Sequence, residues 1–362
     1  MMVLAPALQQ TASAQAQRPA EAAPTETTSA ETLPTITVQS PARSPQSRKR
    51  NGPRTEQTPQ KRTASNPSVQ PATSPPNGAN VASGPVVPPN MASQLTLTGE
   101  EVNARPVTRP GEILEAVPGL VVTQHSGEGK ANQYFLRGYN LDHGTDMAIS
   151  VDDVPINLRT HAHGQGYSDL NWLMPETVNT IDVRKGPYFA DEGDFGSAGN
   201  LHIGLIDSIS KPVAEFTTGS FGYQRIFGMR STKIGDGTLL GALEVGAYNG
   251  PWANPDDMQK LNGLLRYTQG TAQDGFSITG MAYSNRWNST DQVPQRGITS
   301  GQIGLYGEED PSDGGNTNRF ALSGRVAGTD DAGSWKANAY VVKSGLDLYN
   351  NFTYYLANPV QG

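Results

Sequence analysis

Hydrophobic and polar residues alternate with a period of two along much of the chain after about residue 211. In one such segment Phe320 and Leu322 alternate with Arg319, Ala321 and Ser323. Segments of about ten residues with this alternation are typical of membrane β-barrel strands, in which one face contacts lipid and the other an aqueous lumen. A soluble β-sandwich gives similar alternation, so the pattern alone leaves both architectures open. We expect about eight such strands in residues 211–362.

Residues 95–210 have a different pattern, in which short apolar runs are separated by turns rich in glycine and aspartate. The run 109–119 predicts a short helix, because Pro110 suits a first helical turn and Glu112 suits the positive end of the helix dipole. Five short strands are predicted after it, at 120–123, 134–137, 148–151, 180–184 and 201–205. These elements together predict a small mixed α+β domain.

The segment 17–94 is rich in Pro, Ser, Thr, Ala and Gln and poor in large apolar residues. Such a composition buries too little apolar surface to offset the entropy lost on ordering, so we expect a disordered linker. Within it, residues 31–38 form a β-prone island. Residues 1–16 combine a short apolar run with the small-residue pattern Ala12-Ser13-Ala14. This start predicts the remnant of a secretory signal peptide that lacks its basic front.

Composition and motifs argue against several classes of function. The net charge of −7 argues against nucleic-acid binding by the chain as a whole. The absence of cysteine excludes disulfide frameworks, zinc–thiolate sites and cysteine nucleophiles. No apolar stretch is long enough to predict a transmembrane helix. The sequence has no nucleophile elbow, P-loop or H-E-x-x-H motif, so we expect neither an enzyme nor a bound cofactor.

Five motifs follow one another in residues 95–210: EILEAVPGL (112–120), YFLRG (134–138), ISVDDVPI (149–156), VNTIDVRKGP (178–187) and FGSAGNLHI (195–203). In this order and at this spacing they resemble the plug domain of TonB-dependent outer-membrane receptors. Two positions depart from the family pattern, since Asp153 stands in place of a glycine and Lys185 in place of a frequent arginine. In the linker, the segment 31–38 resembles a TonB box, with Leu33, Thr35, Ile36, Thr37 and Val38 as the candidate residues.

The resemblance implies an α+β plug domain at 95–210, followed at 211–362 by the N-terminal strands of an antiparallel transmembrane β-barrel, after a disordered N-terminal leader. Barrels of this family have about 22 strands, of which this chain would supply about a third. An open set of strands would leave unpaired edges in lipid. We therefore expect an incomplete barrel, from a fragment of a longer receptor or from a degenerate gene.

The resemblance also implies a function. We expect a receptor in the bacterial outer membrane that takes up a scarce small-molecule substrate, first of all a metal or a metal chelate such as a siderophore. Energy would come from the inner-membrane protein TonB, to whose sheet edge the TonB box would add as a strand. Alternatives are carbohydrate or cobalamin uptake, a signalling or adhesin barrel that does not transport, and a non-functional truncated receptor.

Basic residues of the second and fourth motifs help to hold the plug in the barrel in this family. The resemblance therefore implies plug–barrel contacts by Arg137, Arg184 and Lys185. Asp152 either pairs with such a base or caps a turn. The alternative is that these charges are solvated on the surface.

Two loops carry the candidate substrate ligands, which are His125, Glu128, His161 and His163. Under the resemblance both loops face the extracellular side. Imidazole together with carboxylate suits Zn, Cu, Ni or a metal held in a chelate, and His161 and His163 are the candidate metal ligands. Contact with a substrate that contains no metal, and a purely structural polar loop, are the alternatives.

Four further residues have expected roles. Tyr167 and Trp172 are candidate stacking partners for a ring in the substrate. His143 is expected in the opposite, periplasmic turn, and His202 in a strand where packing is the expected role.

Overall fold

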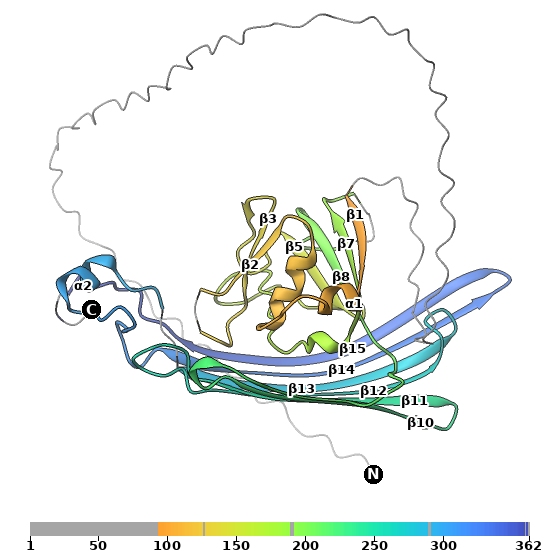
Figure 1. Cartoon of the computed structure of the whole chain (residues 1–362). Helices are drawn as coiled ribbons and strands as arrows, with labels where there is room; N and C mark the ends of the chain where they lie inside the picture. Colours follow the sequence, from red (N-terminus) through yellow and green to blue (C-terminus); the bar gives the residue numbers. More distant parts are fainter. Residues whose placement is uncertain (1–92, 126, 189–191, 289–290, 359, 361–362) are drawn as a thin grey trace, which may run out of the picture. The chain divides into compact units, whose positions relative to one another are not determined.

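The computed structural model describes residues 93–358 except 126, 189–191 and 289–290, together with residue 360. The predicted signal-peptide remnant, the TonB-box segment and nearly all of the predicted linker lie outside these residues. Two regions follow each other along the described chain (Figure 1). We call residues 94–205 the small domain and strands β9–β15 (residues 213–349) the large sheet.

The small domain contains two sheets. One has the strand order β1-β7-β8-β5-β6, in which only the β5–β8 pair is parallel. The other has the order β2-β3-β4 and is antiparallel. The strands are β1 (Gln94–Thr98), β2 (Leu120–Thr123), β3 (Gln133–Leu136), β4 (Tyr139–Asn140), β5 (Met147–Val151), β6 (Val154–Pro155), β7 (Val178–Lys185) and β8 (Gly199–Leu205). The five predicted strands are therefore present, with small shifts of their ends.

Short helices connect these strands. Helix α1 (Gly99–Asn103) begins with a capping box, in which the Thr98 hydroxyl accepts from the Glu101 amide and the Glu101 carboxylate accepts from the Thr98 amide. The predicted helix is a 3-10 helix, η1 (Pro110–Ala116), and is shorter than expected. Its Glu112 carboxylate accepts from the backbone amides of Thr108 and Arg109, as expected for an acid at a helix start. A second 3-10 helix, η2 (Pro175–Thr177), precedes β7.

The apolar core of the small domain draws on η1 and on strands of both sheets. Along β5, Met147, Ile149 and Val151 are buried while the residues between them are half-buried, as the period of a strand requires. Several residues of the large sheet belong to the same apolar cluster, namely Phe227, Met229, Leu240, Ala242, Leu264 and Tyr283. The small domain therefore packs directly on one face of the large sheet.

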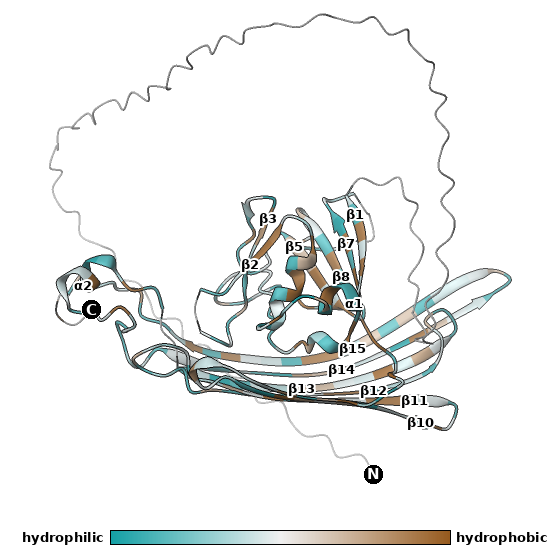
Figure 2. Cartoon of the chain, in the orientation of Figure 1, coloured by the Kyte–Doolittle hydropathy of each residue, from teal (hydrophilic) through white to brown (hydrophobic). Residues whose placement is uncertain are grey.

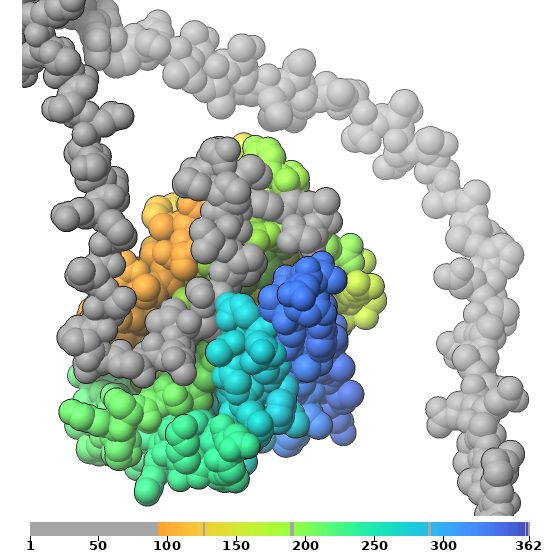
Figure 3. Space-filling view, turned by 90° about the vertical axis from the view of Figure 1, so that its right-hand side faces the viewer, coloured from red at the N-terminus to blue at the C-terminus, as the bar shows by residue number. Residues whose placement is uncertain are grey.

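The large sheet is antiparallel, and its strands follow sequence order. They are β9 (Val213–Thr218), β10 (Gln224–Ile234), β11 (Gly237–Tyr248), β12 (Met258–Gly270), β13 (Gly275–Asn288), β14 (Gly314–Asp330) and β15 (Gly333–Tyr349). The described residues thus contain seven strands of this sheet rather than the eight expected, and no helix among them is long and apolar enough to cross a membrane. In Figure 3 the strands coloured green to blue lie side by side, next to residues of the small domain coloured orange to yellow-green.

The two faces of the large sheet differ as the alternation predicts. Leu265 and Phe320 are exposed, whereas Glu244, Arg266 and Thr279 are buried on the face toward the small domain. Figure 2 shows the resulting alternation of apolar and polar bands along β14 and β15. The sequence pattern therefore assigned these faces correctly.

The two ends of the large sheet also differ. One end has short turns, at 235–236, 271–274 and 331–332. The other end has the connections 219–223, 249–257 and 289–313, the last of which contains helix α2 (Gln295–Ser300). A 3-10 helix, η3 (Ser220–Gly222), lies in the first of these longer connections. We call this end the loop end.

Candidate functional site

Four of the five histidines of the chain meet in one place, although they come from three loops of the small domain. His143 is central, with its ring centroid 5.2 Å from that of His125 and 4.6 Å from that of His163. The His161 ring stacks on Tyr167 at 4.0 Å, and Tyr167 in turn lies 5.7 Å from His143. We call these five residues the imidazole cluster. The prediction that His143 lies in the opposite turn is wrong, because the β4–β5 loop folds back against the other two.

Hydrogen bonds fix the roles of two imidazole nitrogens in the cluster. Nδ1 of His143 lies 3.0 Å from the carbonyl oxygen of Asn132, so this nitrogen carries the proton and Nε2 keeps its lone pair. Nδ1 of His161 accepts from the backbone amide of His163 at 3.2 Å, so its proton is on Nε2. The same loop that carries both histidines therefore uses one of their lone pairs internally.

Burial keeps the cluster uncharged at neutral pH. It lowers the pKa of His125, His161 and His163, and it lowers the pKa of His143, which is only 3% exposed, to about 4. Lys130 is 1% exposed, and burial lowers the pKa of its ammonium group too. The positive charge of Lys130 contributes to the lowered pKa of the neighbouring His125, His143 and His163. The cluster thus offers neutral imidazoles beside a nearly buried cation.

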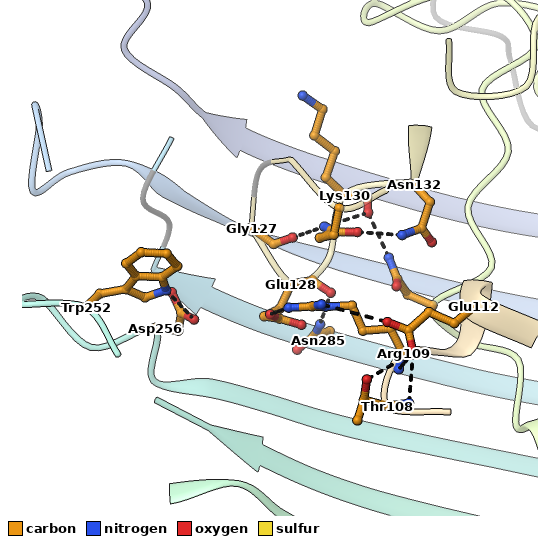
Figure 4. Close-up of polar contacts among 12 residues, drawn as sticks. Thr108, Arg109, Glu112, Gly127, Glu128, Lys130, Asn132, Trp252, Asp256 and Asn285 are labelled. Carbon is orange, nitrogen blue, oxygen red and sulfur yellow. Dashed lines mark hydrogen bonds and ion pairs between the residues drawn. The ribbon is translucent and has the colours of Figure 1, made fainter. Parts of the chain in front are cut away.

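The candidate ligand Glu128 does not join the histidines. Its carboxylate accepts from Arg109 Nη2 at 3.1 Å, and Arg109 also lies beside Glu112 (Figure 4). Its backbone carbonyl accepts from Asn285 of β13 at 3.3 Å. Glu128 therefore ties the β2–β3 loop to η1 and to the large sheet, which corrects the predicted grouping.

The two candidate stacking residues, Tyr167 and Trp172, are buried and contact other residues of the chain. The Tyr167 hydroxyl accepts from the Ala131 amide at 2.8 Å, and His161 covers one face of its ring. Trp172 donates from Nε1 to the Asp169 carbonyl at 2.8 Å, and the Arg319 guanidinium lies 4.9 Å from its ring centroid. Both rings already have partners in this structure, so their stacking on a substrate stays a prediction.

A preformed metal site is not present among the described residues, where no three His, Asp or Glu side chains converge in a way that could hold an ion. His161 and His163 face different neighbours, Tyr167 for one and His143 for the other. The fifth histidine, His202, hydrogen-bonds to Ser150 at 2.8 Å and to Glu192 at 2.9 Å within the small domain.

Two cavities lie between the small domain and the large sheet. One has a volume of about 340 Å³ and is lined on one side by Arg109 and Glu128 and on the other by Tyr248 and Lys260. Close to it, burial and the charge of Glu128 raise the pKa of Asp256 to about 7, and Trp252 donates to this carboxyl group at 3.2 Å (Figure 4).

The second cavity, of about 300 Å³, adjoins the imidazole cluster. His161 and Tyr167 line it on the side of the small domain, and Arg319 lines it on the side of the large sheet. Asp169 also lines it, and burial raises the pKa of this carboxyl group to about 6. Gaps of this size, lined by polar groups, can hold water or a small solute beside the cluster.

Acidic residues of the small domain pair with bases of the large sheet. Asp152 pairs with Arg266 of β12, and Asp153 pairs with Lys336 of β15 at 2.9 Å. Glu176 accepts from both terminal nitrogens of Arg225 of β10, at 2.7 and 2.9 Å. Asp152 therefore pairs with a base of the large sheet rather than with Arg137, Arg184 or Lys185.

The three predicted basic contacts make their described hydrogen bonds within residues 93–205 instead, and not to the large sheet. Arg137 donates to Ser93 at 2.7 Å, Arg184 donates to Glu192 at 2.8 Å, and Lys185 donates to the Pro118 carbonyl. The bases that do pair across the interface are on the large sheet, and sequence reasoning missed them. Part of their signal was present, because Arg225 and Arg266 occupy inward positions of strands whose residues alternate between two faces.

Comparison with known proteins gives one family and one fold. Residues 90–200 match the family "TonB-dependent Receptor Plug Domain". The chain is similar to the ferric citrate transporter FecA in the unliganded form, with a TM-score of 0.58 and 12% identity over 71% of this chain and 41% of that chain. It is similar to the copper transporter OprC, with a TM-score of 0.52 and 15% identity over 70% of this chain and 37% of that one.

A third similar structure is the open form of the ferric-catecholate import receptor Fiu from E. coli K12, with a TM-score of 0.52 and 13% identity over 70% of this chain and 39% of that one. At these identities the similarity shows the fold alone. The chain spans between 37% and 41% of the length of these three proteins.

Proposed function

Because this chain carries the plug domain of the TonB-dependent receptors, we propose that it acts as an outer-membrane receptor for a scarce metal chelate and draws energy from TonB. Members of this family are receptors and transporters rather than enzymes. The small domain is the plug, and the large sheet is the part of the barrel wall on which it packs. The imidazole cluster is the observation that supports the substrate class.

The position of the cluster supports contact with the extracellular side. Gln292, in the 289–313 connection at the loop end, donates to the His125 carbonyl at 3.0 Å. Outer-membrane barrels have short periplasmic turns and longer extracellular loops, so the loop end faces outward. A substrate that arrives from outside would therefore reach His125, His161 and His163 before the rest of the plug.

A chelate fits the cluster better than a bare ion. A bare cation would need several converging ligands, which the described residues do not preform, and Lys130 beside the rings would repel it. A chelate brings its own donor atoms to the metal and presents oxygen atoms outward. Imidazole N–H groups and the Lys130 ammonium are suitable donors to such oxygens.

A binding experiment with a built-in control tests this proposal. Isothermal titration of the purified protein would use Fe³⁺-citrate as the chelate probe and Zn²⁺, Cu²⁺ and Ni²⁺ as bare-ion probes. We expect heat from the chelate, a loss of at least tenfold in its affinity in the His161→Ala/His163→Ala variant, and no loss in His202→Ala. Tenfold is a lower bound, because each hydrogen bond to a charged oxygen that is removed should cost about 1.5–3 kcal/mol.

The outcomes separate the substrate classes. Unchanged chelate binding in the double histidine variant would remove the cluster from the substrate site. Heat from a bare ion that disappears in the same variant would favour direct ligation by His161 and His163 instead. An absence of heat from every probe, with heat from a sugar or from cobalamin, would reassign the receptor to those substrates.

The proposed energy source has its own test. Deletion of residues 31–38 should abolish uptake by cells and leave the binding affinity of the purified protein unchanged, because the box is proposed to bind TonB and not the substrate. Uptake that persists after the deletion would argue against this segment as the TonB box.

A further inference from the structure

Arg266 is the most deeply buried basic side chain among the described residues of the large sheet, with 2% of its surface exposed. It pairs with two carboxylates at once. Its Nη1 donates to Asp152, while its Nε and Nη2 lie 2.9 and 2.8 Å from Oδ1 of Asp207. Its Nη1 also donates to the Thr279 hydroxyl at 2.9 Å. One buried cation is therefore shared by two acids.

The two acids belong to different segments of the chain, although Asp152 also accepts from the Leu205 amide of β8 at 3.0 Å. Asp152 and Asp153 form the two-residue turn between β5 and β6, where both have a left-handed backbone, with φ of 48° and 65°. Asp207 lies after β8, in the segment that connects the small domain to β9, and it also accepts from the Thr268 hydroxyl of β12 at 3.1 Å. Asp207 is thus held to the wall by two residues of β12 without help from the β5–β6 turn.

The number of positive and negative charges around Arg266 is equal when the plug is absent and unequal when it is docked. In the docked state one cation faces two carboxylates, which leaves an excess of one negative charge. When the β5–β6 turn moves away with Asp152, Arg266 and Asp207 stay behind as a matched pair. A buried charge that loses its only partner is strongly unfavourable, and Asp207 prevents that outcome for Arg266.

The second buried anchor has the opposite balance. Arg225 pairs with Glu176 of the plug and, through Nε at 2.7 Å, with Glu244 of β11. Lys260 also pairs with Glu244, at 2.8 Å. Two cations and two carboxylates are matched while the plug is docked, and departure of Glu176 would leave one excess positive charge on the wall.

We propose that Asp207 is a positioning residue that keeps Arg266 neutralised when Asp152 withdraws, so that the β5–β6 turn detaches from the wall before η2 does. The inference rests on the proposed role of the small domain as a movable plug. It assigns an order to the movement, which begins at Arg266 and ends at Arg225. It also assigns to the connecting segment a role beyond joining two domains.

Thiol labelling tests the order directly, because the chain has no cysteine of its own. Val154→Cys places a buried reporter beside the β5–β6 turn, and Thr177→Cys places one beside Glu176 in η2. The purified full chain in detergent would be labelled with a small maleimide, and the rates would be compared. We expect the thiol at 154 to react at least threefold faster than the thiol at 177.

Substitution of Asp207 and of Asp152 should then change the labelling rate at position 154 in opposite directions. Asp207→Asn makes Asp152 the only carboxylate left for Arg266, so labelling at 154 should slow by at least tenfold. Asp152→Asn removes the plug anchor and leaves the Arg266–Asp207 pair, so labelling at 154 should rise by at least threefold. Asp236→Asn removes one exposed carboxylate at the same end of the sheet and should change neither rate.

Each outcome decides the proposal. Faster or unchanged labelling at 154 in Asp207→Asn would show that Asp207 only stabilises the docked state, and would overturn the inference. If Asp207→Asn does not fold, the Asp152→Asn variant decides, since slower or unchanged labelling there contradicts the proposal. The readout uses neither substrate nor TonB, so a failure of the uptake proposal leaves this result standing.

Discussion

The small domain buries most of its large apolar side chains, whereas the large sheet exposes many of them on its outer face and buries several charged residues on its inner face. The small domain buries aliphatic and aromatic residues such as Leu114 and Ile149. The large sheet buries Glu244 and Arg266 and exposes many large apolar residues on its other face. Examples of these exposed residues are Leu243, Leu261, Leu265, Phe320, Leu322 and Val341.

This difference is what we expect if the small domain faces water and the outer face of the large sheet faces lipid, as the proposed function requires. The small domain is organised as a water-soluble protein is, around its own apolar core. The large sheet presents an apolar band outward, as a strand in lipid must, and a mixed face inward. The contact between them is partly apolar and partly made of ion pairs, of which the Arg266 pair is buried and the Asp153–Lys336 pair is partly exposed.

The largest expected effect tests whether the outward face of the large sheet contacts lipid. Leu265, near the middle of β12, is 61% exposed, and Val121, on β2 of the small domain, is 50% exposed. Leu265→Arg should cost about 2–4 kcal/mol of folding free energy in a bilayer. Val121→Arg should change it by less than about 0.5 kcal/mol, because that side chain remains in water.

Urea titration of the protein in lipid vesicles would measure both changes. Equal, small effects of the two arginines would break the comparison, since they would show that both apolar surfaces face water. A large effect of Val121→Arg alone would place the surface of the small domain, rather than the sheet, against an apolar partner.

Much of this difference between the two regions could be predicted from the sequence, because alternation along a strand fixes which residues share a face. Phe320 and Leu322 were assigned to one face and Arg319 to the other on this ground alone, and the structure agrees. The strands of the small domain were predicted from short apolar runs with turns between them. The number of sheet strands was overestimated by one because turn positions, unlike faces, leave only weak signals.

The site was harder to predict, because it depends on contacts between loops. Nothing in the sequence relates His143 to His163, which lies twenty positions later, since no periodic element joins them. Glu128 was grouped with the histidines because its loop neighbours them, yet its carboxylate turns to Arg109. The choice among partners at this range follows from tertiary packing, which residue patterns do not encode.

A smaller expected effect concerns the pH dependence of the stability of the small domain. Its loops contain titratable groups whose pKa values are shifted by burial, unlike the apolar core between its strands. Burial lowers the pKa of His143 from 6.5 to about 4 and raises that of Asp169 from 3.8 to about 6. The unfolded state then binds more protons than the folded state at His143 and fewer at Asp169 over this range. On acidification from pH 6.5 to 4, His143 therefore destabilises the plug while Asp169 stabilises it.

Removing the Asp169 carboxyl group should expose the effect of His143 on the pH dependence of stability. In Asp169→Asn, the plug should lose about 1–3 kcal/mol more stability than the native chain between pH 6.5 and pH 4, because the stabilisation that Asp169 gains on protonation is removed. Denaturant unfolding followed by hydrogen exchange in the small domain would measure the loss at each pH. The charges that face His143, namely Lys130, His163 and Asp142, and the Arg319 that faces Asp169, are unchanged in this variant. An identical pH dependence in both proteins would mean that Asp169 is not buried as a neutral acid.

The smallest expected effect concerns the exposed part of the plug–wall contact. Asp153 and Lys336 pair at 2.9 Å, but their side chains are 34% and 53% exposed, so water screens the attraction. Asp153→Asn keeps a residue that tolerates the left-handed backbone of the turn, and we expect a loss below about 1 kcal/mol. A double-mutant cycle with Lys336→Met would isolate the pair from other effects of each change. A coupling energy well above about 1 kcal/mol would show that water does not screen the Asp153–Lys336 pair. The two ion pairs would then not differ in solvent exposure as described above.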